Sequence, residues 1–246
     1  MFQKKTINNE LYKSLGDKWY HGNDYVELLR SEAKTRNPWI MLQIEKYFNK
    51  NIEILDIGCG GGLLSNDLSK IGYHVSGIDI HEEVLQVARN YDQFKKVKYI
   101  KADALNLPFP DESFDVVCAM DFLEHIEDYQ LALKEGTRVL KKNGLFFFHT
   151  FNRNLFSSLF VIKGMEWFVK GTPKNLHVAH LFIKPSELLS FFSKLNCQKI
   201  ELKGLSPKIF SKSFFNLIQN GVVDKNFTFQ INSSLLTGYI GYVKKN

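Results

Sequence analysis

The sequence predicts an α/β domain whose sheet is mostly parallel, with an antiparallel strand at its edge. Apolar runs of strand length alternate with segments of helical spacing between residues 51 and 150, as is typical of parallel strands joined by right-handed crossover helices. In the stretch 52–62, IEILDIGCGGG, a short buried strand leads into a glycine turn and then a helix. Near the chain's end, two strands follow one another without an obvious crossover helix, which favours an antiparallel pair.

The expected elements follow from these patterns in chain order. Strands are predicted at residues 52–58, 74–80, 97–102, 114–120, 145–151, 197–202 and 234–243. Helices are predicted at residues 28–34, 39–48, 63–71, 82–91, 129–140 and 185–195. Pro38 suits the first turn of the second helix. Because parallel sheets bind ligands at the carboxyl ends of their strands, we expect functional residues where these strands end.

Length and composition fit one globular domain. The 246 residues are 44% hydrophobic and include 21 phenylalanines, enough for a substantial core. We expect an N-terminal helical layer (1–50), a ligand-binding core (51–150), an apolar insertion (151–185) and a C-terminal helix with edge strands (186–246). The net charge of +6 is mild and no dense run of Lys and Arg occurs, so we expect no nucleic-acid partner. Basic charge with apolar surface suits an anionic membrane, and the sequence leaves the oligomeric state open.

The sequence also predicts a compartment. Cys59, Cys118 and Cys197 lie on or beside predicted strands without the spacing of metal ligands, which is typical of reduced, buried thiols. Residues 1–14 lack the apolar core of a signal peptide, and no run of about 18 apolar residues occurs. We therefore expect a cytoplasmic protein, peripheral to the inner face of the membrane.

The spacing of the glycine turn indicates which ligand it serves. Counting from Gly58 and Gly60, Leu63 stands where a dinucleotide fingerprint needs its third glycine, which argues against NAD. Asp56, two positions before the first glycine, suits an ammonium group better than a pyrophosphate. S-adenosylmethionine carries such a group and no phosphate.

Two further acids follow the next strands. Asp79, 21 residues after Gly58, is placed to accept hydrogen bonds from ribose hydroxyls, and Asp103 is placed to bind the adenine amino group. Each acid alone is equally explained as a helix cap. As an ordered set with Asp56, they resemble the class I S-adenosylmethionine-dependent methyltransferases over residues 51–150. That resemblance implies the Rossmann-like, seven-stranded methyltransferase fold.

The segment DFLEH after the fourth predicted strand lies where the transferable methyl group is expected. Asp121, Glu124 and His125 offer two carboxylates and an imidazole, which can hold one divalent cation. Such a cation would lower the pKa of a catechol hydroxyl and orient its oxygen for methyl transfer. The alternative is a metal-free polar pocket in which His125 is the general base. We take Glu124 and His125 as the catalytic candidates.

The stretch 151–185 is too long for an ordinary loop. Its first half is rich in aromatic and aliphatic residues and also contains Lys163 and Lys170, a composition that suits a helix lying in a membrane interface. The same pattern is also typical of a core helix. Its position beside the expected site favours an entrance for a substrate with a lipid tail.

These motifs together resemble the ubiquinone-biosynthesis O-methyltransferases. The matching residues are LDIGCGGG, the D-x-x-E-H segment, Asn152-Arg153-Asn154, the Gly-Thr at 171–172 and the Phe-Ile-Lys-Pro at 182–185. The resemblance implies methylation of a polyprenylated catechol or phenol at the membrane surface. It also implies cofactor contacts from Gly58, Asp79 and Met120, and a magnesium- or zinc-like cation on Asp121, Glu124 and His125.

The family's Arg-x-Asn-Pro element departs in this chain. Thr35 stands at the arginine position, and Arg36, directly before Asn37, is our candidate for the methionine carboxylate. Two other functions remain open from the sequence. One is a soluble methyltransferase for another small acceptor, with 151–185 as a substrate lid, and the other is a non-catalytic binding module. The complete set of strand-end acids argues against the second.

Overall fold

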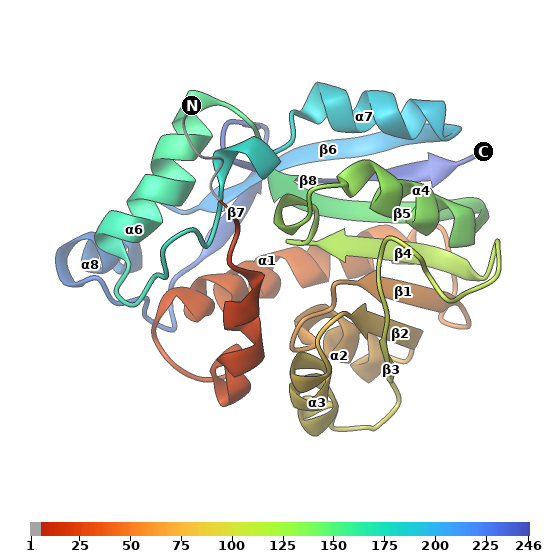
Figure 1. Cartoon of the computed structure of the whole chain (residues 1–246), viewed down its shortest axis with the longest axis horizontal. Coiled ribbons are helices and arrows are strands. Elements are labelled where there is room, and N and C mark those ends of the chain that lie inside the picture. Colours follow the sequence, from red (N-terminus) through yellow and green to blue (C-terminus); the bar gives the residue numbers. More distant parts are fainter. Residues whose placement is uncertain (1–5) are drawn as a thin grey trace.

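The computed structural model describes residues 6–246 and contains one eight-stranded sheet in the order β3-β2-β1-β4-β5-β8-β6-β7 (Figure 1). Neighbouring strands among β1 to β5 are parallel, whereas β8 is antiparallel to both β5 and β6. The predicted Rossmann-like, mostly parallel sheet is confirmed. The strands are β1 (Glu53–Ile57), β2 (His74–Asp79), β3 (Lys98–Lys101), β4 (Phe114–Met120), β5 (Leu140–Phe151), β6 (Cys197–Pro207), β7 (Phe229–Asn232) and β8 (Gly238–Lys245).

The C-terminal part of the sheet differs from the prediction in two ways. The antiparallel strand β8 lies inside the sheet rather than at its edge, and the edge is formed by an additional short strand, β7. The chain between β6 and β7 also forms a helix, α8 (Lys212–Asn220), that the sequence did not predict. Ser211 begins this helix by accepting a hydrogen bond from the backbone N–H of Phe214 at 3.2 Å.

The remaining helices are α1 (Tyr25–Glu45), α2 (Leu63–Lys70), α3 (Glu82–Tyr91), α4 (Tyr129–Val139), α5 (Leu155–Ser157), α6 (Gly164–Phe168) and α7 (Pro185–Lys194), with short helices η1 (Asn9–Ser14), η2 (Gly16–Trp19), η3 (Leu123–His125), η4 (Ser158–Lys163, a π-helix) and η5 (Ala179–Leu181). Of these helices, α2, α3, α4 and α7 lie at predicted positions, whereas α1 and the short helices differ from the prediction. The two helices predicted at 28–34 and 39–48 are one helix, α1, with Pro38 inside it. Val26 before the proline and Ile40 and Ile44 after it are all fully buried, and this burial offsets the backbone hydrogen bond that Pro38 removes.

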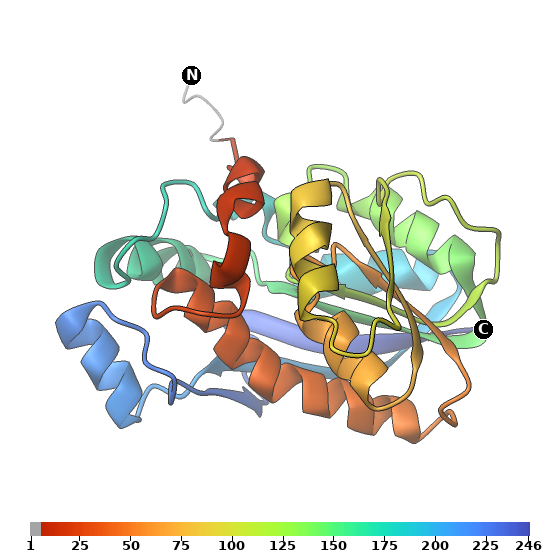
Figure 2. The same cartoon turned by 90° about the horizontal axis from the view of Figure 1, so that it is seen from below.

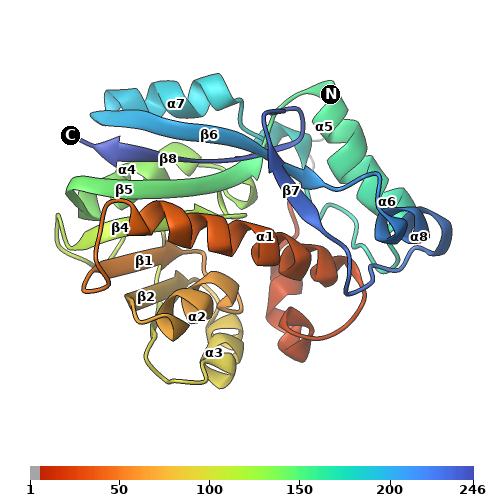
Figure 3. The same ribbon diagram turned by 180° about the vertical axis from the view of Figure 1, so that it is seen from behind.

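Helices cover both faces of the sheet. Leu133 of α4 and Phe192 of α7 pack with Phe146 and Phe148 on the face turned towards the viewer in Figure 1. Helices α1 and α2 pack with Phe147 on the opposite face, which Figure 3 shows in front. The three consecutive phenylalanines of β5 thus alternate between two cores, as the period of a strand requires.

One end of the molecule collects the carboxyl ends of the parallel strands. The short helices η1 and η2, the insertion and α8 all lie at this end, as Figures 1 and 2 show. Gly62 begins α2 there with a left-handed backbone, φ +84°. The fold therefore places the glycine turn, the strand ends and the insertion around one region.

Three predictions concerned buried cysteines, the lack of a membrane-spanning helix and the lack of a signal peptide. Cys59, Cys118 and Cys197 are buried free thiols. Within residues 6–246, no helix combines the length and the apolar composition needed to cross a bilayer. The predicted absence of a signal peptide rests partly on residues 1–5, which lie outside the described residues.

Candidate active site

A cavity of about 980 Å³ opens at the carboxyl ends of the parallel strands. Every residue predicted to bind the cofactor lines it: Arg36, Asp56, Gly58, Gly60, Asp79, Asp103 and Met120. Asp121 and His125 line it as well, whereas Glu124 does not. Its size is at the upper end of the range for ligand pockets, which allows room for a cofactor together with an acceptor.

The glycine turn needs glycine for steric reasons. Gly58 and Gly60 have left-handed backbones, with φ of +65° and +54°. A Cβ atom on Gly60 would lie 2.7 Å from the Trp19 ring, and one on Gly58 would overlap the Phe122 ring. The turn is therefore closed over by aromatic side chains from η2 and from the end of β4, and any larger residue would displace them.

Asp79 at the end of β2 is joined to the glycine turn. Its Oδ2 accepts a hydrogen bond from the Gly60 N–H at 3.2 Å, and its Oδ1 accepts one from the His81 N–H at 2.9 Å. Burial raises the pKa of Asp79, and these backbone N–H groups act against that rise. The carboxylate lines the cavity beside the turn, where it was predicted to meet a ribose.

The other two strand-end acids have different environments. Asp56 is buried, and its Oδ2 accepts a hydrogen bond from the Ser65 hydroxyl at 2.7 Å. Burial raises the pKa of Asp56 to about 6. Asp103 accepts a hydrogen bond from the Leu105 N–H at 2.8 Å, as a simple turn residue would, and it also faces the cavity.

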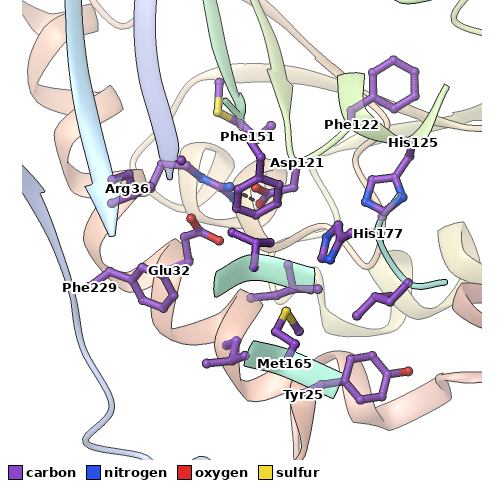
Figure 4. A pocket seen from close by; sticks show the side chains of 18 of the residues that line it. Tyr25, Glu32, Arg36, Asp121, Phe122, His125, Phe151, Met165, His177 and Phe229 are labelled. Carbon is purple, nitrogen blue, oxygen red and sulfur yellow. Dashed lines mark hydrogen bonds and ion pairs between the residues drawn. The ribbon is translucent and has the colours of Figure 1, made fainter. Parts of the chain in front are cut away.

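Arg36 takes part in a buried ionic network beneath the cavity (Figure 4). Its guanidinium pairs with one oxygen of Asp121, and Nδ1 of His149 contacts the other oxygen. His149 Nε2 lies 3.3 Å from a carboxylate oxygen of Glu32, so the imidazole stands between two carboxylates. Burial alone would lower the pKa of His149, but Glu32 and Asp121 raise it to about 9. Arg36 thus lines the predicted cofactor cavity but is engaged with Asp121.

Asp121 has an unusual backbone conformation and a strongly perturbed carboxyl group. Its backbone is left-handed, with φ +51°, which is uncommon for a residue with a side chain. Burial would raise the pKa of its carboxyl, but Arg36 and His149 hold the pKa well below its usual value.

The sequence analysis did not identify Glu32 or His149 as site residues. His149 lies near the end of a predicted strand, and this position is the signal that was available.

The structure does not assemble the three predicted metal ligands. Because η3 is a 3₁₀ helix, Glu124 and His125 project about 120° apart. Glu124 points into the interior, where neither carboxylate oxygen has a hydrogen-bond partner among the described residues. Burial first, and the nearby Asp121 second, raise the pKa of Glu124 to about 8. Within residues 6–246, the ligand atoms that cluster within 4.8 Å belong instead to Glu32, Asp121 and His149.

A cationic side chain of the protein already contacts the cluster of Glu32, Asp121 and His149. The guanidinium of Arg36 contacts Asp121, so the positive charge that two adjacent carboxylates require is supplied by the chain. We therefore find that the predicted set of Asp121, Glu124 and His125 does not fit a single metal ion in this arrangement. The correction has a local cause, since a 3₁₀ turn separates side chains that the sequence places close together.

His125 faces the cavity and is held by Asn9 of η1. The Asn9 amide N–H donates to the His125 carbonyl oxygen at 2.8 Å, which turns its Oδ1 towards His125 Nδ1 at 3.1 Å. Because Oδ1 only accepts, Nδ1 carries the proton and the lone pair is on Nε2, to which the Tyr12 hydroxyl donates. Burial lowers the pKa of His125 to about 4, so the ring is neutral near pH 7. Nε2 lies 3.5 Å from the Tyr12 hydroxyl.

A second imidazole comes from the insertion. The ring of His177 lies 5.5 Å from that of His125, centroid to centroid, and both face the cavity (Figure 4). Burial lowers the pKa of His177 to about 3, so this ring is also neutral. Neither nitrogen of His177 has a hydrogen-bond partner among the described residues. Asn9 and His177 lie far from the strand ends in sequence, and no motif in the sequence marked them.

Comparisons with known proteins identify the family. Residues 55–148 match the family described as "Methyltransferase domain". The ubiquinone biosynthesis O-methyltransferase of Pelagibacter ubique is 34% identical over 86% of this chain and 91% of its own length. The protein of that name from Paraburkholderia xenovorans is also 34% identical, over 82% of this chain and 88% of its own.

The chain belongs to the ubiquinone biosynthesis O-methyltransferase family. It is an S-adenosylmethionine-dependent O-methyltransferase, as the sequence predicted. Solved structures support the fold. The magnesium protoporphyrin IX methyltransferase of Synechocystis has a TM-score of 0.66 at 16% identity, covering 96% of this chain and 97% of its own. A possible histamine N-methyltransferase of Thermotoga maritima has a TM-score of 0.63 at 19% identity, covering 96% of this chain and 99% of its own.

Proposed function

We propose that this O-methyltransferase methylates a hydroxyl of a catechol or phenol that carries a polyprenyl tail, in ubiquinone biosynthesis at the surface of a membrane. The observation that supports this best is the lining of the cavity. The lining includes the glycine turn and the strand-end acids, and it also includes two neutral imidazoles and apolar side chains from the insertion. A charged cofactor suits the first group of residues and an aromatic acceptor with an apolar tail suits the second.

On the cofactor side, each acid has a role in this proposal. Asp79 accepts hydrogen bonds from the ribose hydroxyls, Asp103 binds the adenine amino group, and Asp56 lies towards the methionine ammonium. Arg36 binds the methionine carboxylate, which requires its guanidinium to turn away from Asp121. Gly58 and Gly60 allow the backbone to approach the ligand.

On the acceptor side, His125 acts as the general base. The acceptor hydroxyl donates its proton to Nε2 while its oxygen attacks the methyl carbon and the bond from carbon to sulfur breaks. The products are the methyl ether, S-adenosylhomocysteine and a protonated imidazole. The positive charge thus moves from the sulfonium to His125 and is conserved within the cavity. Holding the acceptor oxygen in line with the methyl group supplies most of the remaining catalysis.

No step of this mechanism uses a metal ion, because Glu124 does not face the cavity and Asp121 is engaged by His149. We therefore expect kcat to stay within about twofold of its normal value after removal of divalent cations by chelator. The measurement is methyl transfer to a water-soluble catechol with and without excess EDTA, followed by metal analysis of the purified protein. Loss of activity that returns on adding Mg²⁺ or Zn²⁺ would restore the metal prediction made from the sequence.

Asn9 should matter because it fixes the tautomer of His125. Replacing Asn9 with alanine frees both the ring and the tautomer, and we expect kcat to fall about tenfold, equivalent to about 1.4 kcal/mol for a lost buried hydrogen bond. The imidazole ¹⁵N shifts of His125 report the tautomer directly, and the variant should no longer show a protonated Nδ1 alone. The control is Asn8→Ala, whose side chain makes no hydrogen bond among the described residues. Unchanged shifts in Asn9→Ala would show that Asn9 does not orient the base.

The acceptor's tail distinguishes this proposal from a soluble methyltransferase with a lid. Phe156, Leu159 and Phe160 line the cavity and are also partly exposed, so an apolar tail can lie along them and leave the protein. A catechol with one or two prenyl units should therefore have a lower KM than catechol itself, since each buried CH₂ contributes about 0.8 kcal/mol. Equal KM values would favour the lid. A protein that binds S-adenosylhomocysteine but methylates neither compound would be a binding module.

A further inference from the structure

The end of the molecule that contains the cavity mouth carries a second apolar helix outside the insertion. We propose that α8 and the helical run 155–168 form one surface, the two-helix face, that docks on an anionic lipid bilayer. This inference rests on the proposed function and adds to it a second membrane-contacting element, α8, that the sequence did not indicate. It assigns to the chain between β6 and β7 a direct contact with lipid.

Large apolar side chains are exposed on both helices. On the insertion, Leu155 is 91% exposed and Trp167 is 66% exposed. On and before α8, Phe210 is 86% exposed and Phe215 is 58% exposed. Single exposed apolar residues are common, but two neighbouring segments that both expose several large apolar side chains indicate an interaction site. The other exposed apolar residues on these two segments are Leu159, Phe160, Phe168, Ile209 and Ile218.

The two helices are structurally joined. The backbone N–H of Lys170, just after α6, donates to the carbonyl oxygen of Gly221, which ends α8, at 2.8 Å. Val169 and Leu217 are buried in one small core together with Val26 of α1. Figures 1 and 3 show α6 and α8 beside each other at one tip of the molecule. The inner sides of both helices are therefore packed, and their outer sides are directed to the surroundings.

The charge of these segments favours an anionic partner. Residues 155–184 contain four lysines and a single acid, Glu166, which is paired with Lys163 at 2.5 Å. Residues 206–223 contain two lysines and no acid. Basic charge around exposed aromatic and aliphatic side chains is the composition of interfacial helices on anionic bilayers. A protein partner is disfavoured because its interface core is normally depleted of lysine.

The cavity mouth opens within this face. Trp167 from the insertion, with Ile209 and Ile218 from the α8 side, are exposed and also line the cavity. The two helices thus form two walls of one entrance. A lipid-tailed acceptor can pass from the bilayer into the cavity between them without entering water, which avoids the cost of exposing its tail.

The test is sedimentation with vesicles of phosphatidylglycerol and phosphatidylcholine, compared with phosphatidylcholine alone. The double variant Phe210→Asp/Phe215→Asp changes one side chain just before α8 and one within it, and neither lines the cavity. We expect it to bind anionic vesicles at least tenfold more weakly than the wild type, with kcat on a water-soluble catechol within twofold. Phe94→Asp is the matched control, because Phe94 is 50% exposed, stands beside two lysines and lies outside this face.

The outcomes separate this inference from the proposed function. If Trp167→Asp/Phe160→Asp abolishes vesicle binding and the α8 variant binds like the wild type, the assignment of α8 is overturned while the membrane role of the insertion stands. If the wild type binds neither type of vesicle, the membrane role itself is overturned, and activity on the soluble catechol still reports on the methyltransferase. Equal binding to neutral and anionic vesicles would contradict the charge argument. A normal melting temperature for each variant confirms that it is folded.

Discussion

Replacing His125 with alanine is expected to lower kcat by roughly 10²- to 10⁴-fold, the range for loss of a general base. The ring is neutral, its proton is fixed on Nδ1 by Asn9, and its Nε2 faces the cavity. His177 also faces the cavity as a neutral imidazole, but among the described residues it has no hydrogen-bond partner that would orient it. Without His125, the acceptor hydroxyl must lose its proton to water.

The measurement is steady-state methyl transfer alongside calorimetric binding of S-adenosylhomocysteine. The dissociation constant should stay within about threefold of the wild type, because His125 lies on the acceptor side of the cavity. His74→Ala is the matched control, since His74 is exposed at the start of β2, the end of that strand away from the cavity. A His125→Ala enzyme with normal kcat would remove His125 from the mechanism, whatever its cofactor affinity.

Replacing Asp79 with alanine is expected to weaken binding of S-adenosylhomocysteine by about 1.5–3 kcal/mol, or roughly 10- to 100-fold, as charge-assisted hydrogen bonds are lost. The same change also removes the acceptor of the Gly60 N–H, so the glycine turn loses a contact as well. Both effects act on the cofactor and neither acts on the acceptor.

Asp79→Asn separates the two effects. The asparagine retains an oxygen for a backbone N–H but loses the negative charge, so it should give an intermediate dissociation constant. Calorimetric titration of the three proteins measures this order directly. An Asp79→Ala protein with the wild-type dissociation constant would show that the ribose lies elsewhere.

The residues proposed to bind the cofactor could be predicted to lie together because their placement depends on local sequence. A buried strand, a glycine turn and acids at successive strand ends are each short patterns, and the parallel sheet brings the ends of its strands to one edge. Asp56, Asp79 and Asp103 accordingly line one cavity with Gly58 and Gly60. The order of elements was sufficient to assemble them.

The acceptor half could not be predicted in the same way. Asn9 reaches His125 across 116 positions of sequence, and His177 comes from an insertion whose path has no repeating pattern. Glu124 was assigned to a metal because it is near Asp121 in sequence, yet the 3₁₀ turn directs it into the core. Proximity along the chain indicates a shared site when the backbone conformation is regular, and this segment is irregular.

Two predictions about the helices were wrong. Pro38 was taken as a helix start, but α1 continues through it because both halves bury apolar side chains. Helix α8 was missed although Phe214, Leu217 and Ile218 have the spacing of an amphipathic helix, and some of its apolar residues are exposed. That same exposure is the basis for assigning α8 to the membrane.

The most direct test of the whole account is methyl transfer by the purified protein to a catechol with a short prenyl tail, with S-adenosylmethionine as donor and EDTA in excess. Mass spectrometry of the product is the measurement. We predict a monomethyl ether and an equal amount of S-adenosylhomocysteine. Tight binding of S-adenosylhomocysteine without any ether, under conditions where Mg²⁺ or Zn²⁺ is also without effect, would contradict the assignment of this cavity to O-methylation of a tailed catechol.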